Sequence, residues 1–376
     1  MSAPYDDTTT KTLYEPQAAQ SAPMLVVSAP PTREQLPSAG PRRMWPAVLV
    51  LFFLAPMVGE MLSGSTPPLA FINPVSLALE AGLYGSGAVL IRELTRGRGR
   101  GWASVVLLGA AYGILEEGLV VTSWFNPYWP DAVSLGTYGR ALDTNWIWAL
   151  GLTAYHAVVS ITIPILLVEL IFPRIGTAPW MGRRGVRRFA VALAVVSTLE
   201  LLGFGFLMFR KQGYTHPPLM FFGAAALAAV LLWLGLHLRL NPLLPSSKPL
   251  PGLWKLRLAA LGTTVAFFVT IWVFPSIVRP AVVTGAAIVA VVVFGVWRVR
   301  TWAARPGWSA EQRLALASGA MGFFLLLAPI IELSHPGGKP TQGMTLAALL
   351  WLAGLVALAL RTGRRARGAA NLTPSV

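Results

Sequence analysis

Two adjacent carboxylates inside an apolar segment are the residues of this sequence that are best suited to chemistry. Glu116 and Glu117 interrupt the segment 102–123, which is otherwise apolar enough to cross a bilayer. His156 lies at a similar depth in the apolar segment 145–171. A charge near the centre of a membrane helix costs about 2.5–3.5 kcal/mol, so each carboxylate has to be protonated, paired or open to water. Carboxylates and an imidazole together can activate water, bind a divalent metal or relay protons.

Helical spacing predicts that further polar side chains face the same interior. Glu80 and Tyr84 share one stripe of polar and small residues in the segment 74–92. Glu200 lies on a similar stripe in the segment 187–209. Because lipid-facing charges are costly, we expect these stripes to face the inside of a helical bundle. The economical hypothesis is a single polar cluster that also holds the acidic pair and the histidine.

The residues around the acidic pair and the histidine favour close helix packing. Gly109 and Gly113 have the spacing that permits two membrane helices to approach closely. Thr153, His156 and Ser160 recur at three to four residues and therefore share one helix face. We expect these two faces to lie toward the interior of the bundle.

A second polar group is predicted at the outer rim of the membrane. Glu60 stands at the end of the first apolar segment. Glu332 and His335 have the Glu-x-x-His spacing that places two ligands on one helix face. Near the opposite membrane face, Glu93 is expected to be a surface partner of Arg96, a structural role.

Ten apolar segments of spanning length predict an all-α fold, a polytopic membrane helical bundle. Tryptophan or tyrosine flanks several of them, as expected at the level of the lipid headgroups. Together the segments form a transmembrane domain over residues 43–361. They fall at about 44–62, 74–92, 102–123, 145–171, 187–209, 217–239, 253–277, 280–298, 312–332 and 344–361.

The basic residues predict the orientation of these segments. With the amino terminus in the cytoplasm, nearly all of the 30 Lys and Arg residues fall on cytoplasmic segments. The exceptions are Arg140, Arg210, Lys211, Arg279 and Lys339. The positive-inside rule therefore predicts that both termini are cytoplasmic, in a bacterial cytoplasmic (inner) membrane. The net charge of +15 then faces the anionic cytoplasmic leaflet of the lipid bilayer, and no nucleic-acid partner is expected.

The composition of the chain excludes most soluble and thiol-based functions. Of its 376 residues, 55% are hydrophobic and 12% are charged, whereas about 25% of the residues of soluble domains are charged. The chain has no cysteine, which excludes disulfides, thiolate catalysis and cysteine metal ligands. It has no Walker A motif, no Rossmann glycine motif and no His-Glu-x-x-His motif.

Three segments outside the apolar runs complete the organisation. Residues 1–42 are rich in Pro, Ala, Ser and Thr and are predicted to be a disordered cytoplasmic tail. Residues 362–376 are predicted to be a basic cytoplasmic tail. The loop Thr122–Trp146 is rich in aromatic residues, which is typical of a membrane-interface belt. The alternative is that this loop forms a lid over a cavity.

The acidic pair and the histidine together resemble the CAAX-protease and bacteriocin-processing family of intramembrane proteases. That family has a Glu-Glu-x-x-x-Arg motif, then Phe-x-x-x-His, then a histidine with Asn or Asp four residues on. In this sequence Val121 stands at the arginine position and Leu152 at the phenylalanine position. No histidine occupies the place of the third motif, where Glu200 is the only candidate substitute.

The resemblance implies that Glu116, Glu117 and His156 are catalytic. It further implies that Glu116 and His156 hold a divalent metal such as zinc, or that the group activates water without one. The stretches "SGSTPP", "YGSGAVLIRE" and "GILEEGL" also resemble an uncharacterised family of bacterial multi-pass membrane proteins. That second resemblance implies no activity and no substrate.

Three functions remain open at this level. The first is an intramembrane hydrolase in which the acidic pair activates water. The second is a proton-coupled transporter in which Glu80, Glu117 and Glu200 form a carboxylate relay. The third is a structural membrane protein in which protonated carboxyl groups join neighbouring helices. The pair of adjacent carboxylates with a histidine at similar depth favours the first.

Overall fold

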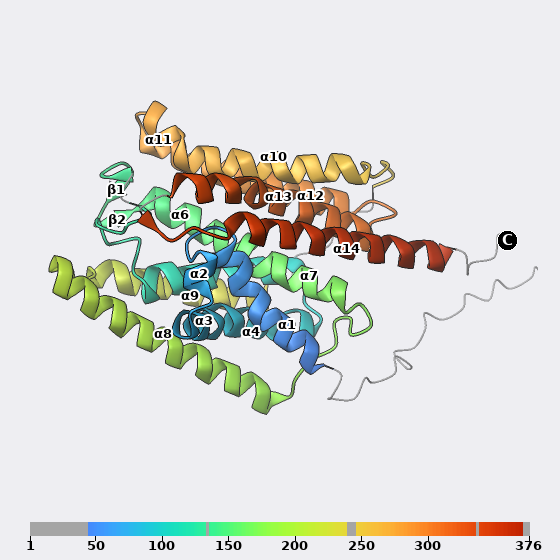
Figure 1. Ribbon diagram of the computed structural model, residues 1–376, viewed down its shortest axis with the longest axis horizontal. Coiled ribbons are helices and arrows are strands. Elements are labelled where there is room, and N and C mark those ends of the chain that lie inside the picture. The colour runs from blue at the N-terminus through green and yellow to red at the C-terminus, as the bar shows by residue number, and fades with distance from the viewer. Residues whose placement is uncertain (1–43, 133–134, 239–245, 336–337, 371–376) are drawn as a thin grey trace, which may run out of the picture. The chain divides into compact units, whose positions relative to one another are not determined.

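The computed structural model describes residues 44–132, 135–238, 246–335 and 338–370, and all structural statements concern these residues. The predicted tail 1–42 lies outside them, as do the last residues of the predicted basic tail. Within the described residues the fold is a bundle of α-helices with one short β-hairpin (Figure 1).

The first part of the bundle consists of helices that change locally into wider π-helical turns. α1 (Trp45–Pro56) continues as the π-helix η2 (Met57–Met61) and is followed by the short α2 (Pro68–Phe71). The next helix comprises α3 (Pro74–Glu80), the π-helix η3 (Ala81–Gly85), α4 (Ser86–Leu94) and the 3₁₀ turn η4 (Arg96–Arg98). The third comprises α5 (Trp102–Ile114) and the π-helix η5 (Leu115–Val120).

A hairpin and the remaining helices follow. Strands β1 (Arg140–Ala141) and β2 (Thr144–Asn145) pair antiparallel, with Arg140 opposite Asn145. The fourth long helix comprises α6 (Trp146–Tyr155), the π-helix η7 (His156–Thr162) and α7 (Ile163–Ile171). The others are α8 (Arg183–Gln212), α9 (Pro218–His237), α10 (Leu253–Trp272), α11 (Phe274–Ile277), α12 (Ala281–Ala303), α13 (Ala310–Ser334) and α14 (Met344–Ala370).

Nine helices of the described chain are long and apolar enough to cross a membrane, and a tenth apolar helix, Trp45–Met61, is shorter. The predicted all-α polytopic bundle is therefore confirmed. Several helix ends differ from the expected positions, among them those of α10 and α14. α10 ends at Trp272, before the expected 277, because Pro275 cannot donate the backbone hydrogen bond that a continuing helix needs. α14 continues to Ala370, past the expected 361, through arginines and alanines that favour helix.

Local sequence signals account for several helix starts and ends. Asn73 precedes α3 and accepts hydrogen bonds from the backbone N–H groups of Val75 and Ser76, at 3.0 and 3.4 Å. Ser309 and Gln312 form a capping box at the start of α13. α8 ends at Gly213, which has a φ of 62° in the left-handed region that glycine adopts without strain.

The two larger hydrophobic clusters of the bundle both contain residues beside the polar site. One cluster joins α6, η7 and α7 to α10, α13 and α14, and it includes Tyr155 and Val159. The other joins α1, η3, α4, α5 and α7, and it includes Tyr84 and Tyr112. The polar site described below is therefore enclosed by apolar packing on two sides.

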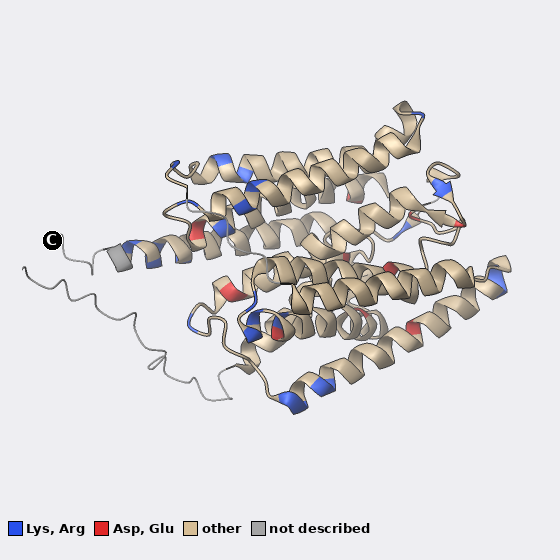
Figure 2. Cartoon of the chain, turned by 180° about the vertical axis from the view of Figure 1, so that it is seen from behind, with Lys and Arg blue, Asp and Glu red and all other residues tan. Residues whose placement is uncertain are grey.

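The charged residues are unevenly distributed along the helices. Figure 2 shows most Lys and Arg residues at the end of the bundle where α14 terminates and α8 begins. This is the end that the positive-inside rule predicts to face the cytoplasm.

Arg92 ties the segment after α7 to α4 at this end of the bundle. Its guanidinium is fully buried and donates to the Glu93 carboxylate at 2.7 Å. It also donates to the backbone carbonyls of Gly176 and Ala178, at 2.9 and 2.8 Å. It lies 3.8 Å from the ring centroid of Trp180, a cation–π contact. These contacts fix the loop between α7 and α8.

The expectation that Glu93 pairs with Arg96 at the surface is wrong. Glu93 is buried, and its carboxylate accepts from the backbone N–H of Trp180 at 3.1 Å as well as from Arg92. Arg96 instead donates to both carboxylate oxygens of Glu169, at 3.0 and 3.1 Å. The sequence spacing did not predict these partners. The loop after α7 folds back against α4 and supplies backbone N–H donors to the Glu93 carboxylate.

Candidate functional site

Four π-helical turns carry the polar residues of the site, and no other π-helix occurs in the described residues. Glu60 lies in η2 and Tyr84 in η3. Glu116 and Glu117 lie in η5, and His156 is the first residue of η7. Such turns are rare, and they are found frequently at functional sites. The wider turn re-aims these side chains relative to a regular α-helix.

The acidic pair and the histidine converge in the interior. His156 Nε2 lies 3.1 Å from Glu116 Oε2 and 3.2 Å from Glu117 Oε1. One ligand atom from each of the three residues lies within 4.8 Å of the other two, a group that could hold a metal ion. Ligand atoms on one tetrahedral zinc ion stand about 3.3 Å apart, given zinc–ligand distances of about 2.0–2.1 Å. The two short separations therefore fit a shared cation.

One carboxylate oxygen of this group makes no hydrogen bond. Glu116 Oε2 is buried and makes no hydrogen bond of acceptable geometry with any described residue, although His156 Nε2 is close. A single N–H on Nε2 cannot point at both carboxylates at once. A cation placed among the three ligand atoms would satisfy this oxygen together with Glu117 and the ring nitrogen.

The groups behind the three residues fix their orientation. His156 Nδ1 lies 3.1 Å from Ser160 Oγ, as the shared helix face of these two residues predicts. With the proton on Nδ1 directed at Ser160, the lone pair of Nε2 faces the carboxylates. Ser123 Oγ donates to Glu117 Oε2, and Trp148 Nε1 donates to Ser123 at 3.0 Å. These supporting groups resemble those that orient metal ligands in proteins.

Three tyrosine rings surround the imidazole. The centroid of the His156 ring lies 5.2 Å from Tyr155, 5.8 Å from Tyr84 and 6.3 Å from Tyr112. The side chains of His156, Glu116 and Glu117 are 1%, 8% and 9% exposed. Electrostatic interactions inside the group are therefore little screened by solvent.

A second set of carboxylates adjoins the first. Tyr84 Oη donates to Glu60 Oε1 at 2.6 Å. The Thr66 hydroxyl lies 3.0 Å from Glu80 Oε1 and 3.4 Å from Glu60 Oε2, so it bridges the two acids. Glu200 is the only buried residue of α8, and its carboxyl group is close enough to those of Glu60 and Glu80 for an electrostatic interaction. Glu60, predicted at the outer rim, thus contacts Tyr84 and shares Thr66 with Glu80.

The other two rim residues have separate partners. Glu332 accepts from the backbone N–H groups of Gly343 and Thr345, at 2.7 and 2.8 Å, and so joins the end of α13 to the start of α14. His335 follows the last residue of α13 with a φ of 44°, and its Nδ1 contacts Thr341 Oγ1 at 2.7 Å. Because the helix ends at Ser334, Glu332 and His335 do not share one helix face as their spacing predicts.

The loop after the acidic pair packs onto the site. Trp124 and Phe125 are buried in the core, and Ser123 contacts Glu117 directly. Tyr138 donates to the Val278 carbonyl at 2.8 Å, which links the loop to the segment before α12. Tyr128 and Trp146 of the same loop are exposed, so the loop turns some aromatic side chains toward the core and leaves others at the surface.

Sequence reasoning missed Tyr155, Ser123 and Trp148. In a regular α-helix, a residue adjacent to His156 points about 100° away from it, so Tyr155 gave no periodic signal. Ser123 and Trp148 lie in and after a loop whose path the sequence does not specify. The short separation of six residues between Glu117 and Ser123 was the one local signal that could have indicated their contact.

The close contact between α5 and η7 gives a testable prediction. A Cβ on Gly113 would lie 2.9 Å from His156 Cβ and 3.2 Å from the Thr153 backbone. Gly113→Leu is therefore expected to push His156 away from the carboxylates and to cost about 1–3 kcal/mol of stability by overpacking. Thermal unfolding and zinc titration of the purified protein would measure both effects.

Gly203→Leu on α8 is the matched control, because nothing lies within 4 Å of a Cβ there. It should leave both stability and zinc affinity close to wild type. Equal effects of the two substitutions would show that the α5–η7 contact does not position His156.

Comparisons with known proteins agree with this architecture. A model of an uncharacterised membrane protein family matches residues 49–370, which include every residue of the site. No curated protein and no solved structure matches the chain significantly. The match covers the long apolar helices together with the buried Glu/His cluster. The chain therefore belongs to this uncharacterised family of membrane proteins.

Proposed function

We propose that the protein is an intramembrane hydrolase whose centre is Glu116, Glu117 and His156. The observation that carries the proposal is the convergence of two carboxylates and one imidazole in the interior of an apolar bundle. Three protein ligands with one open position are typical of catalytic zinc sites, whereas structural zinc sites have four. The resemblance of Glu116-Glu117 and His156 to the CAAX-protease and bacteriocin-processing motifs supports the same class.

The residues present fit a divalent metal such as zinc. Glu116 and His156 would hold it, and Glu117 would complete the set. The Glu116 oxygen that makes no hydrogen bond, 3.1 Å from His156 Nε2, favours this arrangement. When bound, such a metal polarises a carbonyl group and activates water. The chain's own groups orient the ligands: Ser160 holds the imidazole, and Ser123 holds Glu117.

In the proposed hydrolysis, the oxygen of water forms a bond to the carbonyl carbon of a peptide, and the carbon–nitrogen bond breaks. One proton from water passes to a carboxylate oxygen of the site and then to the departing amine. Glu60, held by Tyr84, is a further carboxylate beside the site that could accept this proton. The loop Thr122–Trp146 would limit the entry of bulk water, since its buried aromatic residues cover the site.

The proposal is tested by the peptide ends that the protein generates in cells. Wild-type protein and the variant Glu116→Gln/Glu117→Gln would be expressed at equal levels in a bacterial host that lacks the chromosomal copy. Mass spectrometry would then compare the new amino termini among membrane proteins. We expect termini that appear with wild type and are lost with the variant. Identical sets of termini would contradict a peptidase.

A second candidate, proton-coupled transport, is favoured by the acids outside the ligand group. Thr66 bridges Glu60 and Glu80, and the carboxyl group of Glu200 is close enough to both for an electrostatic interaction, so carboxylates extend from the centre toward α8. This function requires Glu80 and Glu200 and no metal. In proteoliposomes with a pH gradient, proton flux that is lost in Glu80→Gln would favour the transporter over the hydrolase.

We further propose that the protein lies in the bacterial cytoplasmic membrane with both termini in the cytoplasm. The basic end of the bundle in Figure 2 supports this orientation. In that orientation, the loop that covers the site lies on the outer side. We therefore expect activity from a reporter that works only in the cytoplasm when it is fused after Ala370.

A further inference from the structure

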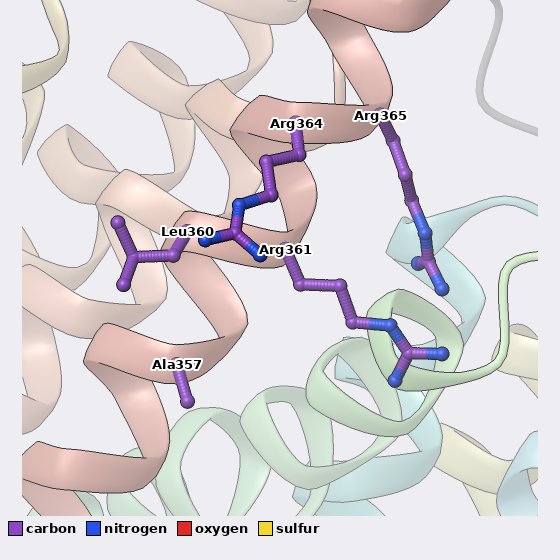
Figure 3. A pocket seen from close by; sticks show the side chains of 5 residues that line it. All are labelled: Ala357, Leu360, Arg361, Arg364 and Arg365. Atoms are coloured by element: carbon purple, nitrogen blue, oxygen red, sulfur yellow. The ribbon is translucent and has the colours of Figure 1, made fainter.

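A basic pocket lies on α14 at the end of the bundle that is rich in Lys and Arg. It has a volume of about 460 Å³ and is lined by Ala357, Leu360, Arg361, Arg364 and Arg365. Figure 3 shows that the three arginine side chains extend from the same stretch of the helix. None of the residues that line this pocket belongs to the group of Glu116, Glu117 and His156.

The arginines of this pocket are poorly compensated. Arg361 and Arg364 are exposed, and neither makes an ion pair or hydrogen bond with a described residue. Arg365 makes one bond, to the carbonyl of Leu170 at 3.4 Å, near the end of α7. The positive charges of Arg361 and Arg174 also act on Arg365. The Glu311 carboxylate lies beside Gly363 of the same stretch but makes no ion pair with these arginines. Gathering like charges is unfavourable, and an anion in the pocket would offset the repulsion.

A second basic pocket provides a contrast. It has a volume of about 270 Å³ and is lined in part by Trp297, Arg298 and Arg305. There Arg298 lies 4.6 Å over the ring of Trp302, and Arg305 donates to the Pro249 carbonyl at 2.9 Å. Its arginines are thus engaged by the protein, whereas those of the α14 pocket remain available to a ligand.

The position of the pocket along α14 indicates the kind of anion. Residues 344–360 of α14 carry no charged side chain, and Arg361 is the first. Ala357 and Leu360, which precede it by four and one residues, are exposed. An apolar wall beneath a ring of guanidinium groups matches a molecule that has an acyl chain below an anionic headgroup.

We propose that this pocket binds the phosphate group of an anionic phospholipid of the cytoplasmic leaflet. Arg361 and Arg364 hold the phosphate, and Ala357 and Leu360 contact the upper part of an acyl chain. Arg365 joins the site to the end of α7, so a bound lipid bridges α14 and the long helix that contains His156.

The test is native mass spectrometry of the full-length protein in a neutral detergent, titrated with phosphatidylglycerol or phosphatidylcholine of the same acyl chains. We expect the wild type to prefer phosphatidylglycerol. Arg361→Gln/Arg364→Gln should weaken phosphatidylglycerol binding by about 30-fold, the loss expected for two basic residues beside an anionic headgroup. Arg361→Lys/Arg364→Lys keeps the charge and should retain most of the binding.

Arg187→Gln/Arg188→Gln is the matched control, because it removes two exposed arginines from α8 at the same end of the bundle. It should change the affinity by less than about twofold. Equal binding by the wild type and Arg361→Gln/Arg364→Gln would overturn the proposal. Displacement of the lipid by an equal concentration of glycerol 3-phosphate would also overturn it, because the pocket would then recognise soluble phosphate rather than lipid.

Discussion

His156→Ala is expected to lower the affinity for zinc by at least about 100-fold, since loss of a group that merely supports a ligand already costs about 10–100-fold. The imidazole provides the only nitrogen in the group of three, and its Nε2 is the atom that both carboxylates approach, at 3.1 and 3.2 Å. Without it, the two carboxylates have no neutral ligand between them and repel each other. Isothermal titration of the purified protein with zinc would measure the loss.

Glu200→Gln is the matched control for this prediction. Glu200 is buried and adjoins the second set of carboxylates, but it is not among the three residues whose ligand atoms converge. Its replacement removes a buried acid without touching the centre, so the zinc affinity should remain within about twofold of wild type. If His156→Ala and Glu200→Gln weakened binding equally, zinc would be bound by the acids in general and not at the proposed centre.

Arg92→Leu is expected to destabilise the protein by about 3–5 kcal/mol, the cost of removing one partner from a buried ion pair. The Arg92 guanidinium is fully buried beside Glu93 and holds two backbone carbonyls of the loop between α7 and α8. Its loss leaves the Glu93 carboxylate without its counter-charge and the Gly176 and Ala178 carbonyls without their donor. Chemical unfolding in mixed micelles, followed by tryptophan fluorescence, would measure the change.

Arg98→Leu provides the control, because Arg98 is exposed in the next turn and makes no ion pair within the described chain. Its effect should stay within about 0.5 kcal/mol. The double variant Arg92→Leu/Glu93→Leu should lose less stability than the sum of the two single variants. In the double variant no buried carboxylate remains without a counter-charge. A loss for Arg92→Leu no larger than that for Arg98→Leu would contradict a stabilising role of this ion pair.

Much of the fold could be predicted from the sequence because it rests on hydropathy. Apolar segments of spanning length can be recognised without knowing their tertiary contacts. The sequence therefore predicted the approximate positions of the helices. The errors lie where tertiary contacts decide, as at Glu93, whose partners come from the loop between α7 and α8. The end of α10 was set by Pro275, a local signal that a hydropathy window averages away.

The site was predictable in part. The cost of burying charge predicted that Glu116, Glu117 and His156 face the interior, and their convergence agrees with that argument. The π-helical turns were not predictable, because no residue pattern in the sequence specifies them. Glu60 and Tyr84 each lie in such a turn, and their hydrogen bond is a contact that regular helical periodicity does not anticipate.

The central claim is that Glu116, Glu117 and His156 form a metal centre. The most direct test is the metal content of the wild-type protein, purified in detergent without chelators, by inductively coupled plasma mass spectrometry. Near-stoichiometric zinc or another divalent metal, lost in Glu116→Gln/Glu117→Gln and retained in Glu200→Gln, is the predicted result. A wild-type protein that contains no divalent metal, and that binds none when zinc is added, would contradict it.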